Sequence, residues 1–64
     1  MPRYMVTLRR TGGPRLVTSV VVDAADPAEA RANAAGFAEL RRGGVFEARA
    51  CRRAPVGTPL DDLV

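Results

Sequence analysis

The alternation of hydrophobic and polar residues predicts two strands in the first third of the chain. From Tyr4 to Arg9, and again from Leu16 to Asp23, apolar side chains recur at every second position, as in strands with one buried face. The residues expected to face the core are Tyr4, Val6, Leu8, Leu16, Val20 and Val22, with Thr18 beside them. Residues 11–14 (Thr-Gly-Gly-Pro) combine glycines that accept a positive φ with a proline that blocks ladder pairing. The two strands are therefore expected to form a hairpin.

The next segment has a helix period and strong capping signals. Asp26 is a good N-cap, Pro27 suits the first helical position, and Glu29 stands three residues after the cap, where it can close a capping box. The helix is expected to continue through Arg42 and to end at Gly43 in the left-handed C′ position. Its apolar stripe is expected to consist of Ala30, Ala34, Phe37 and Ala38, with Asn33 and Leu40 on the border.

A third strand is predicted from Val45 to Arg52 by a further alternation. Inward positions are expected at Phe46, Ala48 and Ala50, and outward positions at Glu47, Arg49 and Cys51. Two prolines and a glycine then interrupt regular structure, and Leu60 to Val64 is expected to form one helical turn or a mobile tail. Residues 1–54 thus form one domain, and residues 55–64 form a tail that is either mobile or docked on it.

The predicted fold class is α+β, with the element order β-β-α-β. A right-handed crossover through the helix returns the third strand parallel to the second. The simplest arrangement places the first strand in the middle of a three-stranded antiparallel sheet of order 2-1-3, with the helix packed on one face. With 64 residues and three aromatic side chains, the core is small, so a partner or a second copy would add stability.

The predicted topology gathers positive charge at one end of the domain. The first strand and the helix end there, and the second and third strands begin there. This end, the arginine pole, comprises Arg9, Arg10, Arg15, Arg41 and Arg42. The chain has a net charge of +3, and residues 1–55 hold all ten arginines but only five of the seven acidic residues. Such a surface favours nucleic acid or an acidic protein surface as the partner.

The sheet face opposite the helix, the open face, is a second candidate site. It is expected to expose a mixture of apolar and arginine side chains, a composition typical of protein interfaces. The residues proposed for this interface are Met5, Val17, Val21, Arg49 and Cys51. The second and third strands also offer unpaired edges for strand addition. The alternatives are that the tail folds back over this face or that a homodimer covers it.

The composition argues against an enzyme. The chain has no histidine, so Cys51 lacks the usual base, and the scattered carboxylates show no metal-ligand spacing. The paired glycines lack the lysine and hydroxyl residue of a phosphate-binding loop. We therefore expect no catalytic residues, no metal and no cofactor. A lone cysteine, no long apolar run and no signal-peptide core favour a soluble cytoplasmic protein that does not bind membranes.

Residues 20–34 (Val-Val-Val-Asp-Ala-Ala-Asp-Pro-Ala-Glu-Ala-Arg-Ala-Asn-Ala) resemble the strand-to-helix segment of the DpnD/PcfM-like small proteins. The resemblance implies a bacterial protein encoded by a phage, plasmid or other mobile element, and the family has no established enzymatic role to carry over to this chain. The resulting hypothesis is a non-enzymatic inhibitor or adaptor of the anti-defence type, which docks on a host protein or nucleoprotein complex. The alternative is a nucleic-acid-binding protein whose arginine pole contacts phosphates.

Overall fold

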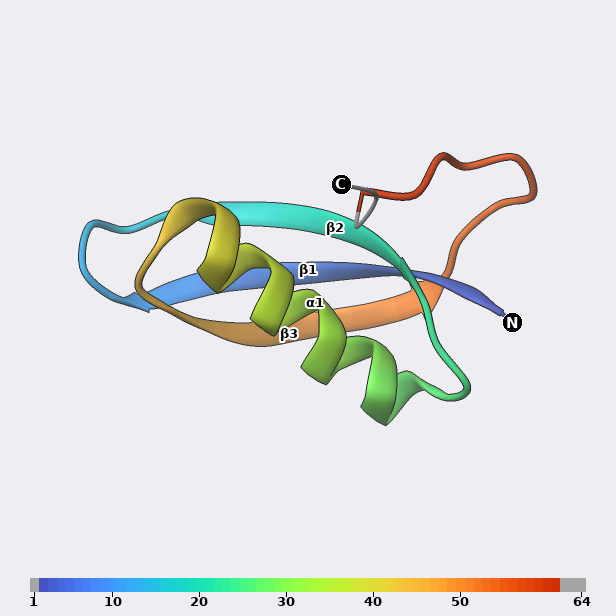
Figure 1. Ribbon diagram of the computed structural model, residues 1–64, viewed down its shortest axis with the longest axis horizontal. Coiled ribbons are helices and arrows are strands. Elements are labelled where there is room, and N and C mark those ends of the chain that lie inside the picture. Colours follow the sequence, from blue (N-terminus) through green and yellow to red (C-terminus); the bar gives the residue numbers. More distant parts are fainter. Residues whose placement is uncertain (1, 62–64) are drawn as a thin grey trace.

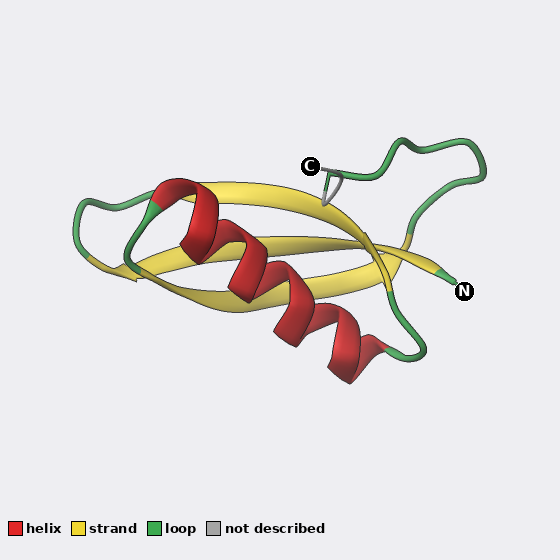
Figure 2. Cartoon of the chain, in the orientation of Figure 1, coloured by secondary structure: helices red, strands yellow, loops and turns green. Residues whose placement is uncertain are grey.

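Three antiparallel strands and one helix make up the domain, and a computed structural model describes residues 2–61 (Figure 1). The elements are β1 (Arg3–Gly12), β2 (Val17–Asp23), α1 (Pro27–Arg42) and β3 (Val45–Arg53). The strand order is β2-β1-β3, and α1 crosses one face of the sheet obliquely (Figure 2). The predicted ββαβ fold and its sheet order are confirmed.

The ends of α1 are fixed by the residues that the sequence indicated. The carboxylate of Asp26 accepts a hydrogen bond from the backbone N–H of Glu29 at 2.8 Å. Glu29 in turn accepts from the N–H of Ala25 at 3.3 Å, one residue before the cap. At the other end the N–H of Gly43 donates to the carbonyl of Glu39 at 2.9 Å. Gly43 has a φ of 75° as expected, but its ψ of 162° lies outside the left-handed helical region.

The core lies between α1 and the face of the sheet that it covers. The helix contributes only alanines to the fully buried layer, while Phe37 is half-buried. Leu40, predicted on the border of the apolar stripe, is instead 89% exposed. The buried core consists of Tyr4, Val6, Leu8, Val20, Val22, Ala24, Ala30, Ala34, Ala38 and Phe46. Because alanine side chains are short, the helix axis can lie close to the sheet.

A β-bulge in β3 changes which residues face the helix. Val6 pairs with Cys51 and Thr7 with Ala50, but the next pair along β1 skips Arg49. The extra residue shifts the alternation by one position, so Ala50 is exposed and Cys51 packs against the core. The predicted orientations of Ala50 and Cys51 are therefore wrong.

The segment after β3 returns to the outer edge of β2. A guanidinium nitrogen of Arg3 donates to the carbonyl of Thr58 at 2.6 Å. Further along, the N–H of Asp61 donates to the carbonyl of Val21, and the Asp61 carboxylate accepts from the Val21 N–H, both at 2.9 Å. Leu60 and Asp61 are not helical, and the remainder of the turn predicted over Leu60 to Val64 lies outside the described residues.

Candidate anion-binding site

The arginine pole lies at the end of the domain where two connections meet. Figure 1 shows the β1–β2 loop and the α1–β3 turn at the same end of the sheet. Arg9 and Arg10 belong to the last part of β1, Arg15 to the loop, and Arg41 and Arg42 to the last turn of α1. The five side chains have different surroundings, and these decide which of them can bind a ligand.

Arg10 holds the two connections together. Its guanidinium donates to the carbonyl of Arg42 at 2.9 Å and to that of Pro14 at 3.3 Å, and it lies over the Phe46 ring, 5.4 Å from the centroid. Its Nε is buried and has no hydrogen-bond partner within residues 2–61. Since its hydrogen bonds join the hairpin loop to the end of α1, Arg10 positions this end of the domain and is not available as a ligand-binding side chain.

The α1–β3 turn passes very close to the end of β1, and Gly44 permits this approach. Its φ is 87°, a value that side-chain-bearing residues rarely adopt. A Cβ atom at Gly44 would lie 2.6 Å from the carbonyl oxygen of Gly12 and 3.1 Å from the Arg10 Cδ. The second of the paired glycines is therefore required by packing, and it keeps the turn against the Arg10 side chain.

Arg9 lies on the open face and belongs to an ion-pair network. Its guanidinium is 3.7 Å from the Glu47 carboxylate, which also accepts a hydrogen bond from Arg49 at 3.0 Å. The side chains of Arg9 and Glu47 are 36% and 49% exposed, so this pair contributes little to stability. It nevertheless offsets part of the positive charge that Arg9 would bring to the arginine pole.

The other three arginines of the pole, Arg15, Arg41 and Arg42, are exposed. Within residues 2–61 none of them lies within salt-bridge distance of a carboxylate. Arg41 lies over the Phe37 ring, 5.5 Å from the centroid, which orients its guanidinium. These three side chains retain their full charge for an external anion.

Two shallow concavities flank the Arg10 side chain. One, of about 270 Å³, lies between the two connections and is lined by Arg10, Gly12, Pro14, Arg42, Gly43 and Gly44. The other, of about 320 Å³, is lined by Arg9, Arg10, Thr11, Gly13 and Arg15. Both combine guanidinium groups with glycine backbone, a combination that suits an oxyanion.

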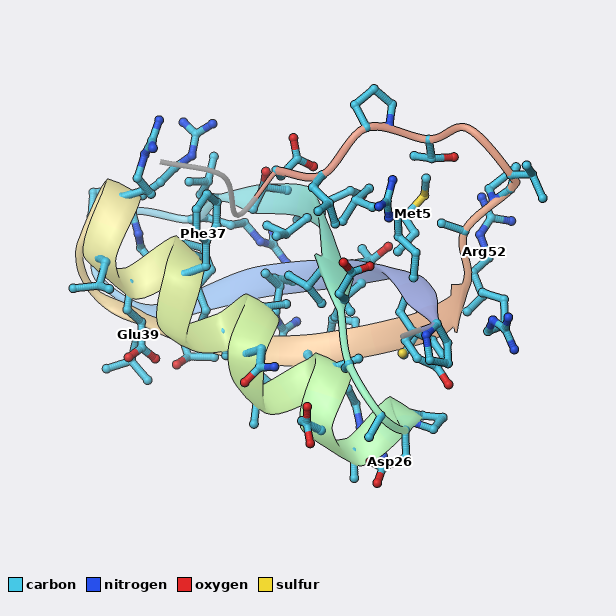
Figure 3. All side chains as sticks on the ribbon, turned by 45° about the vertical axis from the view of Figure 1, so that its right-hand side comes forward. Met5, Asp26, Phe37, Glu39 and Arg52 are labelled. Atoms are coloured by element: carbon cyan, nitrogen blue, oxygen red, sulfur yellow. The ribbon has the colours of Figure 1, made fainter. Side chains whose placement is uncertain are left out.

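The structure places the five proposed interface residues of the open face in different environments. Met5 is half-buried, and its sulfur accepts a hydrogen bond from a guanidinium nitrogen of Arg52 at 3.7 Å. Figure 3 shows the two side chains side by side. Val17 is 61% exposed. Val21, expected to be exposed, is only 5% accessible, and Asp61 of the returning tail is hydrogen-bonded to its backbone.

The last two interface candidates lie on β3 and are separated by the bulge. Arg49 is exposed and paired with Glu47. Cys51 lies on the side of the sheet that faces the helix, and its thiol is 3.9 Å from the carbonyl of Pro27. The expectation that Cys51 belongs to the open face is therefore wrong.

Within the described part of the chain, no group of three or more cysteine or acidic side chains could hold a metal ion. The same residues include no helix of sufficient length and apolarity to cross a membrane.

A groove between β2 and α1 was not foreseen from the sequence. It has a volume of about 390 Å³ and is lined by Thr18, Ser19, Val20, Phe37, Ala38, Arg41, Arg42 and Asp61. One signal was present, because Phe37 and Arg41 are four residues apart and meet on one face of a helix. The return of Asp61 to the same groove has no local sequence signal.

Comparisons with protein families, curated proteins and solved structures gave no match to this chain.

Proposed function

We propose that this chain is a non-enzymatic binding protein that contacts the phosphate groups of a nucleic acid through Arg15, Arg41 and Arg42. The observation that carries the proposal is that these three guanidinium groups share one end of the domain without a carboxylate partner among residues 2–61. Guanidinium groups bind phosphate oxygens in a bidentate manner, and clustered arginines draw polyanions to a surface.

Arg10 supports this role indirectly. It keeps the hairpin loop and the end of α1 together, and it lines both concavities, one of them with Arg42 and the other with Arg15. Tyr4 and Phe46 are buried, so neither offers a stacking surface for a base. Phe37 is half-buried, and its ring already has the Arg41 guanidinium over it. Binding should therefore depend on the phosphate backbone and show little sequence preference.

The salt dependence of binding tests this proposal. Fluorescence polarisation with a labelled DNA duplex should give a log–log slope of about −2.7, because each of the three contacts contributes about −0.9. If all five arginines bound phosphates, the slope would be about −4.5. Loss of one of these arginines should make the log–log slope less negative by about 0.9. This applies to each of the single variants Arg15→Gln, Arg41→Gln and Arg42→Gln.

Arg31→Gln is the matched control, because Arg31 is exposed on α1 and makes no ion pair within residues 2–61. It removes the same charge away from the pole. A slope near zero for the unmodified protein, or an equal loss of binding in the Arg31 variant, would contradict the proposal.

A second candidate function is docking on a host protein or nucleoprotein complex, as an inhibitor or adaptor encoded by a phage or mobile element and acting in the cytoplasm. The observation that favours it is the open face, where Val17 is 61% exposed opposite Arg9, and where Met5 and Arg52 are in contact further along the sheet. Val17→Glu should abolish capture of a host protein in a pull-down that includes nuclease. Capture lost on nuclease treatment instead points to the arginine pole, and sedimentation equilibrium tests for a homodimer.

A further inference from the structure

The outer edge of β2 presents unpaired backbone groups. The N–H of Arg10 donates to the carbonyl of Leu16 at 2.8 Å, which fixes the even-numbered residues of β2 as those bonded to β1. The odd-numbered residues Val17, Ser19 and Val21 therefore direct their N–H and C=O groups away from the sheet. Among residues 2–61, only the groups of Val21 find partners there.

Asp61 shows how the unpaired backbone groups at this edge can be hydrogen-bonded. Its backbone N–H donates to the Val21 carbonyl, and its carboxylate accepts from the Val21 N–H, each at 2.9 Å. One acidic residue thus supplies both a donor and an acceptor to one outward-facing position of β2. The neighbouring outward position, Ser19, offers an unpaired N–H and C=O of the same kind. Val17, two residues earlier in the sequence, offers another such pair.

The groove beside this edge has the shape and charge to hold a second chain. Its volume is about 390 Å³, and the C-terminal half of α1 forms the wall opposite β2. Phe37 and Ala38 contribute apolar surface, and Arg41 and Arg42 contribute two cations with no carboxylate within salt-bridge distance in residues 2–61. Asp61 also lines the groove, and its carboxylate accepts the hydrogen bond from the Val21 N–H. Figure 3 shows Phe37 on the side of α1 that faces β2.

We propose that this groove binds an extended acidic peptide segment of a partner protein by strand addition to β2. The backbone of the peptide pairs with the outward groups of Ser19 and Val17, and its carboxylates lie near Arg41 and Arg42. The main-chain hydrogen bonds provide affinity for an extended segment, and the two cations select an acidic one.

The structure favours such a peptide over a second copy of this chain. In an antiparallel pair of β2 strands centred on Ser19, Val17 of the second copy would lie opposite Val21. Asp61 already holds the outward groups of Val21, so that register is blocked. The β2 strand itself carries only one acidic residue, Asp23, which is paired with Arg3 at 3.1 Å.

A short fluorescein-labelled peptide in which valine and aspartate alternate is a suitable probe. Ser19→Pro removes the outward N–H without touching the ladder to β1, so the dissociation constant should rise by about tenfold, equivalent to about 1.4 kcal/mol. Ser19→Ala keeps the N–H and should bind as the unmodified protein does. Arg15→Gln should also leave peptide affinity unchanged, because Arg15 lies outside the groove.

The unmodified protein provides a test that does not depend on folding of a variant. A peptide that is N-methylated at every residue cannot donate to the outward carbonyls of β2 and should lose binding. A peptide with asparagine in place of aspartate should bind several-fold more weakly. Equal binding of the N-methylated peptide would overturn the proposal. So would a dimer in sedimentation equilibrium that Ser19→Pro dissociates, or a large gain in peptide affinity on deletion of residues 62–64. The DNA-binding slope of Ser19→Pro should not change, which separates this proposal from the proposed function.

Discussion

Replacement of Arg10 by methionine should destabilise the domain although it removes a positive charge from a crowded cluster. The variant loses hydrogen bonds to the carbonyls of Arg42 and Pro14, worth about 1 kcal/mol each, and a cation–π contact with Phe46 worth about 0.5 kcal/mol. Methionine keeps an apolar stem over the ring. The expected loss is therefore about 2–3 kcal/mol, against a total of about 3–10 kcal/mol for a domain of this size.

Urea unfolding followed by far-UV circular dichroism measures this loss directly. The midpoint should fall with little change in the slope of free energy against urea, and the melting temperature should fall by about 10–20 °C. Arg15→Met is the matched control, because it removes the same charge from an exposed loop residue with no side-chain hydrogen bond or ion pair within residues 2–61. An Arg10→Met variant that unfolds at the same urea concentration as Arg15→Met would refute the bridging role of Arg10.

Three further substitutions have expected outcomes in the same unfolding assay. Gly44→Ala should cost about 2 kcal/mol or more, because its Cβ would lie 2.6 Å from the Gly12 carbonyl at a φ of 87°. Gly36→Ala should stabilise by about 0.5–1 kcal/mol, since it lies inside α1 with open space around its Cβ; a loss of stability would contradict this. Asp61→Ala should cost about 1–2 kcal/mol and should speed amide hydrogen exchange at Val21, whose N–H loses its acceptor. Unchanged exchange at Val21 would argue against the docking of the tail.

Local signals were sufficient to predict the elements and the sheet order. The N-cap at Asp26 and the proline after it have a direct structural counterpart, and the alternation in β1 matches its buried positions. The bulge at Arg49 could not be predicted in this way. Residues 47–51 alternate without a break, and Ala50 is small enough to lie on either face, so their composition does not reveal the extra residue.

The position of the arginine pole follows from topology, but the surroundings of each arginine do not. Arg10 bonds to backbone carbonyls, and any residue type at positions 14 and 42 would supply them, so the sequence gives no hint of the contact. The backbone groups of Val21 at the edge of β2 are satisfied by Asp61, forty residues further along the chain. Long-range backbone partners of this kind have no periodicity or motif from which they can be inferred.

The buried alanines of α1 should tolerate smaller side chains but not larger ones. Ala30, Ala34 and Ala38 are at most 2% exposed and contribute a single methyl group each. Truncation can remove almost nothing there, whereas any longer side chain must push the helix away from the sheet or distort its rotamers. Natural variation at these positions should therefore be confined to glycine, alanine and serine, while the outward face of the same helix is free to diverge. Among the residues of α1, sequence variation should therefore be most restricted at these three buried alanines.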